Sequence, residues 1–299
     1  GAANMERLNM VGRSIDRTIE FIDNVYIPDL LAIASFYKDW AAIGGGLSSK
    51  YLMSYGDFPK SANDYSPGNM MMPAGVIIDG NLNEVLPVDL MKEDEVQEFV
   101  THSWYKYADE AAGLHPLKGE TVPNFDIGGA KGTRTAIEAV DEASKYSWVK
   151  APRWKGHAMV LAKLGGVPVT ALFSTLGRTA ARGLECSWAA HKLKDEYNKL
   201  IASIKAGDVA TANMASFEPS TWKKSAQGVG FVEAPRGALA HWIDIEDKKI
   251  KNYQCVVPTT WNASPRDPAG KIGAYEAALL DTPMHDPEQP LEILRTIHS

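Results

Sequence analysis

The part of the sequence best equipped for chemistry is a pair of segments in its last third. The first is Gly228-Val-Gly-Phe-Val-Glu-Ala-Pro-Arg-Gly237, and the second is Tyr253-Gln-Cys-Val-Val-Pro-Thr-Thr-Trp-Asn262. Within the first, Pro235-Arg236-Gly237 predicts a tight turn that places a permanently charged guanidinium between apolar strands. A charge in such surroundings normally has a partner.

Two kinds of partner fit Arg236. The first is an anion or a polar ligand. Thr259 and Thr260, at the exit of the predicted return strand, offer hydroxyl and backbone donors that would hold it together with the guanidinium. The alternative is an ordinary ion pair with a carboxylate, for which Glu233 is available three residues earlier. The residues by themselves leave both interpretations open.

Most other catalytic signatures are absent. The sequence has no phosphate-binding Gly-x-x-x-x-Gly-Lys-Ser/Thr loop, no His-Glu-x-x-His and no Gly-x-Ser-x-Gly. Gly128-Gly-Ala-Lys-Gly-Thr133 has the wrong spacing for phosphate and is interpreted as a surface loop. The seven histidines are dispersed, without a helical i, i+4 metal pair, and are interpreted as structural.

Composition excludes several classes of protein. The 299 residues include 45% hydrophobic and 23% charged residues, which excludes a disordered chain. The formal net charge of −6, with dispersed basic residues, argues against a nucleic-acid partner. Two cysteines, Cys186 and Cys255, cannot form a disulfide framework or a four-cysteine zinc site. We predict that both are small, buried packing residues, and that the chain, which starts without a Met, is a fragment.

Two long helices must position these segments. The apolar residues of the first recur at helical spacing, and Pro28 should interrupt it before a continuation over residues 30–36. The second is predicted from Ser174 to Ala206, with Gly207 as its C-cap. Gly177 and Gly183 inside this helix point to close helix packing. The face expected for the first helix consists of Leu8, Val11, Ile15, Ile19, Ile22 and Tyr26.

The remaining elements are shorter. A hairpin is expected around Asp79-Gly80, inside a mostly irregular stretch over residues 44–150. An antiparallel hairpin is predicted from Ala238–Ile245 and Ile250–Val257, followed by a short helix over residues 274–280. The predicted class is mainly α (α+β), a long-helix bundle with peripheral antiparallel β-hairpins and long irregular segments. Residues 1–299 are expected to form a single domain.

Several ordered motifs resemble the large subunit of nickel–iron hydrogenases, of the membrane-bound uptake type. Besides the two segments above, the resemblance rests on Gly1-Ala-Ala-Asn-Met-Glu-Arg-Leu-Asn9 and Tyr146-Ser-Trp-Val-Lys-Ala-Pro-Arg-Trp154. It also rests on Ile272-Gly-Ala-Tyr-Glu-Ala-Ala-Leu279 and Pro287-Glu-Gln-Pro-Leu-Glu-Ile-Leu-Arg-Thr-Ile-His-Ser299. The match covers nearly the whole chain and corresponds to the C-terminal half of such a subunit.

The resemblance implies heterolytic oxidation of H2 at a nickel–iron centre whose iron carries cyanide and carbon monoxide. In that family four cysteine thiolates, from an Arg-x-Cys-Gly-x-Cys and an Asp-Pro-Cys-x-x-Cys motif, hold the metals. Neither motif occurs here. We expect the first to precede Gly1 and the second to follow Ser299, so the fragment alone should lack the metal centre and be inactive.

The resemblance also implies roles for residues around the metals. Arg236 resembles the catalytic arginine suspended over the metal pair, Thr259 the hydroxyl residue bonded to a cyanide, and Pro235 a residue lining the same pocket. The main-chain carbonyl of Cys255, and not its thiol, resembles a ligand of a buried magnesium. The magnesium's other protein ligands, a glutamate and a histidine, are expected outside this chain.

The expected partners are an iron–sulfur small subunit, whose clusters receive the electrons, and a membrane cytochrome b. The expected location is the periplasmic side of the cell membrane. One departure from the family is internal: after Lys155-Gly-His-Ala-Met159 a segment of about 25 residues, of helix-forming length, is expected to be missing near residues 159–160.

A non-catalytic alternative has the same fold. The quinone-reacting subunit of respiratory complex I is related to these hydrogenases and lacks the cysteines, so the chain could act as a binding or scaffold subunit. The Val257-Pro-Thr-Thr-Trp-Asn262 segment and the ending Pro290-Leu-Glu-Ile-Leu-Arg-Thr-Ile-His-Ser299 favour the hydrogenase.

Overall fold

The computed structural model describes most of the chain, in two compact units. One unit comprises residues 1–43 and 162–222 with residue 299, and the other comprises residues 44–161 and 223–298. Two compact units can belong to one folding domain, so the single domain predicted for residues 1–299 stays a prediction. The described residues are 5–44, 52–61, 64–78, 80–109, 112–123, 151–154, 173–212, 214–266 and 270–298.

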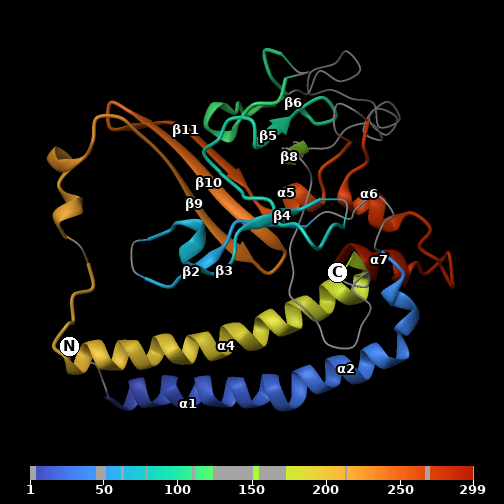
Figure 1. Ribbon diagram of the computed structural model, residues 1–299, viewed down its shortest axis with the longest axis horizontal. Coiled ribbons are helices and arrows are strands. Elements are labelled where there is room, and N and C mark those ends of the chain that lie inside the picture. The colour runs from blue at the N-terminus through green and yellow to red at the C-terminus, as the bar shows by residue number, and fades with distance from the viewer. Residues whose placement is uncertain are drawn as a thin grey trace. The chain divides into compact units, whose positions relative to one another are not determined.

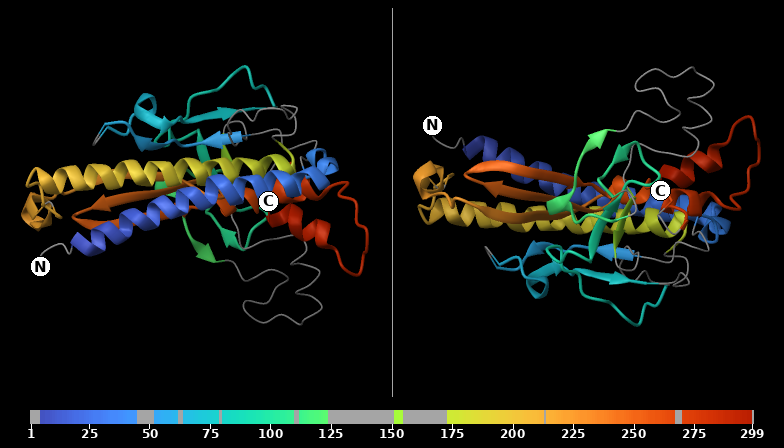
Figure 2. Two further views of the ribbon diagram at one scale, coloured as in Figure 1. Left: turned by 90° about the horizontal axis from the view of Figure 1, so that it is seen from below. Right: turned by 90° about the horizontal axis from the view of Figure 1, so that it is seen from above.

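The first unit is built on two antiparallel helical rods (Figure 1). One consists of α1 (Met5–Phe21), a π-helical turn (Ile22–Tyr26) and α2 (Ile27–Phe36), followed by a 3₁₀ turn over Lys38–Ala41. The other is α4 (Thr175–Lys205). They lie side by side in both views of Figure 2.

Polar contacts fix the register of the two rods. The Tyr197 hydroxyl donates to the Leu8 carbonyl at 2.9 Å, and Lys194 pairs with Asp16 at 2.6 Å. Further along, Ser187 Oγ and His191 Nε2 both lie 2.7 Å from the Asp23 carboxylate. These hydrogen bonds lower the pKa of Asp23. As residue numbers fall along α4 they rise along the other rod, which is what an antiparallel pair requires.

Proline causes the π-helical turn. Pro28 has no N–H, so the ordinary bond from residue 28 to residue 24 cannot form. The Ile27 N–H instead donates to the Ile22 carbonyl, five residues back. The predicted interruption at Pro28 is therefore confirmed, and it takes the form of one widened turn. The expected apolar face is only partly confirmed, since Ile15 and Ile22 are buried but Val11 is exposed.

The prediction of α4 is confirmed at both ends. The Ser174 hydroxyl accepts a hydrogen bond from the Gly177 N–H at 3.0 Å, which caps the start of the helix. Gly207 has a φ of 80° just past the end, as a C-cap glycine should. Close packing accounts for Gly183: a Cβ there would lie 2.6 Å from Leu30 Cδ2.

The second unit centres on a three-stranded antiparallel sheet in the order β11-β10-β9. The strands are β9 (Ala226–Ala234), β10 (Gly237–Glu246) and β11 (Lys249–Val256), so the predicted hairpin is confirmed. Trp242, Ala238 and Ala240 face the core and are at most 3% exposed. This is the opposite face of β10 from Leu239, His241 and Ile243.

Short strand pairs surround the sheet. Of the hairpin expected around Asp79-Gly80, the described residues show one isolated bridge, in which Val76 and Leu86 exchange both backbone hydrogen bonds at 2.9 Å. The bridge does not extend into a ladder among the described residues, and β4 pairs with β1 along its other edge. The small strands are β1 (Leu52–Ser54), β2 (Asp57–Pro59), β3 (Met70–Met72), β4 (Gly75–Ile77), β5 (Val96–Phe99), β6 (Tyr105–Lys106), β7 (Val122–Pro123) and β8 (Ala151–Trp154).

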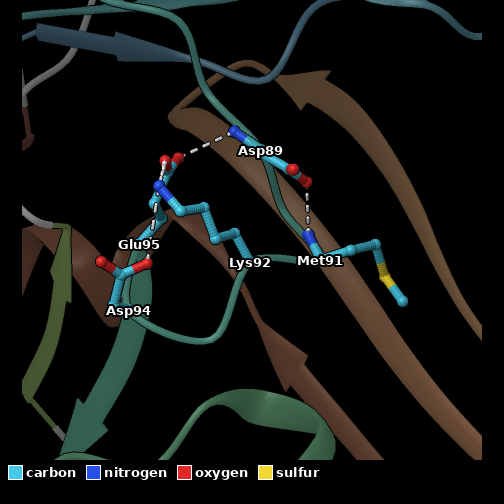
Figure 3. A network of polar contacts seen from close by, with 5 residues as sticks. All are labelled: Asp89, Met91, Lys92, Asp94 and Glu95. Atoms are coloured by element: carbon cyan, nitrogen blue, oxygen red, sulfur yellow. Dashed lines mark hydrogen bonds and ion pairs between the residues drawn. The ribbon is translucent and has the colours of Figure 1, made fainter.

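A network of polar contacts joins Asp89, Met91, Lys92 and Glu95 in the loop before β5 (Figure 3). Glu95 accepts from the Asp89 N–H at 3.0 Å and from Lys92 at 2.9 Å, while Asp89 accepts from the Met91 N–H at 3.0 Å. The loop presents the Leu90 carbonyl, to which Trp242 Nε1 donates at 2.8 Å. The buried indole therefore has a hydrogen-bond partner.

Three helices follow the sheet in the second unit: α5 (Pro258–Asn262), α6 (Ala274–Leu279) and α7 (Leu291–His298). The short helix predicted over residues 274–280 is confirmed. Helices and small antiparallel sheets together confirm the α+β class. None of the helices in the described ranges combines the length and apolar character that crossing a bilayer requires.

Gly273 provides a test of how α6 is packed. An added Cβ would overlap with the backbone carbonyl oxygen of Ser264, which cannot swing aside as a side chain can. We expect Gly273→Ala to destabilise the protein by roughly 1–3 kcal/mol, measured by denaturant unfolding. Gly230→Ala is the matched control, because nothing lies within 4 Å of the position its Cβ would take. Equal stability of the two variants would contradict this packing.

Candidate functional site

The candidate site is the turn that joins β9 to β10. Ala234 and Gly237 pair across it, so Pro235 and Arg236 form a two-residue connection. Gly237 has a φ of 124°, which favours a residue without a Cβ. Pro235 and Arg236 are both exposed. The tight turn predicted from Pro235-Arg236-Gly237 is therefore observed.

The turn is tied to the second predicted segment. The Asn262 side-chain amide donates to the Arg236 carbonyl at 3.0 Å, which fastens the end of α5 to the turn. Thr259 is exposed in the first turn of α5, where Pro258 suits a helix start. The fold thus brings the segment of Thr259 beside that of Pro235 and Arg236, and the hydrogen bond between the two segments is made by Asn262.

Arg236 does not pair with Glu233. No ion pair to Arg236 is found among the described residues, and the Glu233 carboxylate is engaged elsewhere. Its Oε1 accepts a hydrogen bond from the Tyr55 N–H at 2.6 Å. The ion-pair interpretation of Arg236 is thus wrong for Glu233, because the carboxylate faces the connection between β1 and β2. The Arg236 guanidinium, which carries five N–H donors, is exposed.

Two hydrogen bonds of opposite direction join the end of β9 to residues 55–57. While Glu233 accepts from the Tyr55 N–H, the Glu233 N–H donates to Asp57 Oδ2 at 2.9 Å. β9 lies at the edge of its sheet, so an outward N–H there has no strand to donate to. We call this pair of contacts the carboxylate clasp: Glu233 and Asp57 with the Tyr55 N–H.

The pKa of the Glu233 carboxyl in the clasp is raised. Burial is the main cause that raises the pKa of Glu233 to about 7, and the nearby Asp57 charge acts in the same direction. Hydrogen bonds from Tyr55, Ser54 and Gly56 lower it in part. Desolvation disfavours the charged form, and a neighbouring carboxylate does the same. Glu233 therefore changes charge near neutral pH, three residues from Arg236.

Both cysteines are exposed, so the prediction that they are buried packing residues is wrong. Cys255 lies on β11 opposite His241, and its Sγ is 3.6 Å from His241 Nδ1, which also lies 2.6 Å from the Tyr253 hydroxyl. Alternation along the strand explains the exposure, because Gln254 and Val256 take the buried side. Partial burial raises the pKa of the Cys255 thiol.

The described residues do not by themselves fit a thiolate-held metal pair. The sequence contains two cysteines where such a centre takes four. Across the described ranges, no three His, Cys, Asp or Glu side chains gather in a group that could hold a metal ion. The Cys255 carbonyl is a single oxygen donor, and its role toward magnesium stays a prediction.

Two buried polar atoms lie near α5. Within the described part of the chain, neither the Tyr55 hydroxyl nor Trp261 Nε1 meets a partner with good hydrogen-bond geometry. Burial, with the Glu233 carboxylate adding to it, raises the pKa of Tyr55 well above its ordinary value. The Tyr55 side chain also interacts with Trp261, which lowers the pKa of Tyr55 in part.

Sequence reasoning missed the residues that hold the turn in place. Asp57 lies 176 residues from Glu233, and Asn262 lies 26 residues from Arg236. Spacing along the chain does not predict a contact between residues as far apart as Asp57 and Glu233. The sequence suggests Glu233 only as a partner of Arg236, whereas its actual partner is a backbone N–H.

Solved structures with a similar fold are hydrogenases. The nickel–iron–selenium hydrogenase from Desulfovibrio vulgaris Hildenborough, in the reduced state, matches with a TM-score of 0.72 and 28% identity over 98% of this chain and 60% of that one. A reduced, active form of the nickel–iron–selenium hydrogenase from Desulfomicrobium baculatum matches with a TM-score of 0.72 and 29% identity over 98% and 59%.

The family model described as nickel-dependent hydrogenase matches residues 1–165 and 159–299, and the chain belongs to that family. It is 59% identical over 324 residues to the uptake hydrogenase large subunit of Rhizobium leguminosarum bv. viciae. It is 51% identical over 323 residues to the hydrogenase-1 large chain of Escherichia coli (strain K12). Both matches cover 100% of this chain and 54% of the relative, so the chain spans about half their length. The missing segment near residues 159–160 lies outside the described residues and stays a prediction.

The perturbed carboxyl predicts how stability depends on pH. The folded protein holds the Glu233 proton up to about pH 7, whereas the unfolded chain releases it near the ordinary value of 4.5. Rising pH across this window therefore favours unfolding, by about 3 kcal/mol in total. We expect Glu233→Gln to remove this loss, as measured by unfolding at pH 4.5 and pH 8.

The matched control is Glu246→Gln on the same sheet, where the carboxylate is 58% exposed and pairs with Lys251 at 2.9 Å. This change should leave the pH slope as it is in the unmodified protein. An unchanged slope in Glu233→Gln as well would contradict the assignment of the proton to Glu233.

Proposed function

We propose that this chain is the C-terminal part of a nickel–iron hydrogenase large subunit, which oxidises H2 to protons and electrons that pass to an iron–sulfur small subunit. The observation that carries the proposal is the Arg236 turn. Its backbone is bound by Asn262, while its guanidinium is exposed and makes no ion pair with a described carboxylate. An exposed cation on a turn whose backbone is bound is suited to a ligand that develops negative charge.

Three side chains would act around the metal pair without ligating it. Arg236 would stabilise negative charge, or assist proton removal, through its planar set of N–H donors. Thr259 would donate its hydroxyl to a cyanide, and Pro235 would line the same pocket with apolar surface. Such neighbours orient and tune a metal site. The nickel–iron centre, with its cyanide and carbon monoxide, supplies the redox chemistry when bound.

The metals themselves need donors beyond this chain. We infer that the four thiolates come from parts of the whole subunit that this chain does not span. The Cys255 carbonyl would be one ligand of a magnesium ion whose glutamate and histidine ligands also lie outside it. The thiol of Cys255 plays no part in this proposal.

The proposed partners and location follow from the same resemblance. The iron–sulfur clusters would reside in the small subunit, and a membrane cytochrome b would take the electrons onward. The assembly would lie at the periplasmic side of the cell membrane. The names of the relatives, which are large subunits or large chains, support a partner subunit.

The donor count predicts the metal content of the isolated chain. With two cysteines and no metal-binding group among the described residues, the purified 299-residue chain should contain no stoichiometric nickel or iron. Elemental analysis by mass spectrometry checks this, and infrared spectroscopy should show no cyanide or carbonyl bands. Stoichiometric nickel and iron together with those bands would overturn the prediction.

Arg236→Lys tests the proposed role in the whole subunit assembled with its small subunit. Lysine keeps the charge but loses the planar fork, so we expect turnover to fall by roughly 10²-fold or more while metal content is kept. Hydrogen oxidation with a redox dye and elemental analysis are the two measurements.

The control is Arg266→Lys, which changes an exposed arginine 3.7 Å from Glu276 and should leave turnover unaffected. Normal hydrogen oxidation in Arg236→Lys would remove Arg236 from the mechanism. An unmodified assembly that holds its metals but never oxidises H2 would favour the non-catalytic scaffold.

A further inference from the structure

The candidate turn is held from two sides, and only one side belongs to a segment singled out in the sequence. On the α5 side, the Asn262 amide binds the Arg236 carbonyl at 3.0 Å. On the β9 side, the carboxylate clasp binds Glu233 through both its side chain and its backbone N–H. Nothing in the proposed mechanism uses Glu233 or Asp57.

We propose that Glu233 is a positioning residue for Arg236: through the carboxylate clasp it fixes the end of β9, and hence the direction in which the turn presents the guanidinium. This inference rests on the proposed function, since Arg236 is the group that would act. Glu233 itself does not touch the reacting atoms.

The geometry of the clasp explains why it constrains the turn. Glu233 is the next-to-last residue of β9, and its bonds at 2.6 Å and 2.9 Å hold the strand edge to the connection between β1 and β2. Gly56 in that connection has a φ of 88°, and an added Cβ there would lie 3.2 Å from the Met72 carbonyl oxygen. Close packing of this connection against β3 leaves no room for a side chain at Gly56, which suits a support for the edge strand.

The clasp also couples the turn to pH. Asp57 is the charged neighbour of the Glu233 carboxyl, the Tyr55 phenol is a second titratable group that its charge acts on, and the Tyr55 N–H donates a hydrogen bond to it. Across β9, Glu233 pairs with Ala238, which carries no charge. Because the pKa of Glu233 is raised to about 7, the clasp holds a neutral carboxylic acid below that pH and a carboxylate above it. The carboxylate accepts the Tyr55 N–H more strongly but lies against the Asp57 charge.

The test uses the whole large subunit assembled with its small subunit. Glu233→Ala removes the acceptor, so amide exchange over residues 234–237 should become faster than in the unmodified protein. The kcat of hydrogen oxidation should fall by about 10-fold to 100-fold, since a displacement of about 1 Å can cost 10²-fold. Metal content should not change.

Two conservative variants separate charge from shape. Because Glu233 changes charge near pH 7, we expect the kcat of the unmodified assembly to show an inflection at about that pH. Glu233→Gln keeps an acceptor oxygen, so exchange should stay near that of the unmodified protein while this inflection disappears. Asp57→Asn removes the neighbouring charge and should move that inflection to lower pH. Glu246→Gln, at the far end of the same sheet, should change neither measurement.

Amide exchange, kcat and the pH dependence of kcat test separate parts of the proposal. Unchanged exchange over residues 234–237 in Glu233→Ala overturns the clasp, whatever the activity. Faster exchange with normal kcat, in an assembly whose unmodified form oxidises H2, overturns the positioning role. An inflection that survives in Glu233→Gln refutes the coupling to pH. If the unmodified, metal-loaded assembly does not oxidise H2, the proposed function fails, and this positioning role fails with it even where exchange still shows the clasp.

Discussion

The structure of the site depends on which partners the outward backbone groups of the edge strand β9 bind. An edge strand presents backbone groups that must find partners outside the sheet. Here the Glu233 N–H donates to the Asp57 carboxylate, and the Glu233 carboxylate accepts a hydrogen bond from the Tyr55 N–H. The same contacts that satisfy the edge also hold the Pro235–Arg236 turn, so a structural requirement of the sheet becomes a constraint on the charged side chain.

Local patterns explain how much of the fold could be predicted. The ends of α4 follow from Ser174 and Gly207, and the break before α2 follows from the missing N–H of Pro28. These are short-range effects, and the sequence states them directly. The form of the break could not be predicted, because both a π-helical turn and a kink are compatible with the missing N–H of Pro28.

Long-range contacts explain what could not be predicted. Residue type and resemblance identify the turn, yet they assign Glu233 the wrong partner, because the sequence cannot show that Tyr55 and Asp57 reach the edge of β9. The cysteine prediction is wrong for a related reason. Residue type favours burial for cysteine, but the alternation of β11 places Cys255 on the side opposite Gln254 and Val256.

The clasp and the Asn262 bond both arise within the second unit, so the direction of the Arg236 turn is set by residues that accompany it in the chain. Catalytic groups stabilise charge best when they are oriented before the reaction and need not reorganise. A turn held by the clasp and by Asn262 is held without using the N–H donors of the Arg236 guanidinium. Such a turn can meet a metal centre whose thiolates come from elsewhere, because its own geometry does not depend on them.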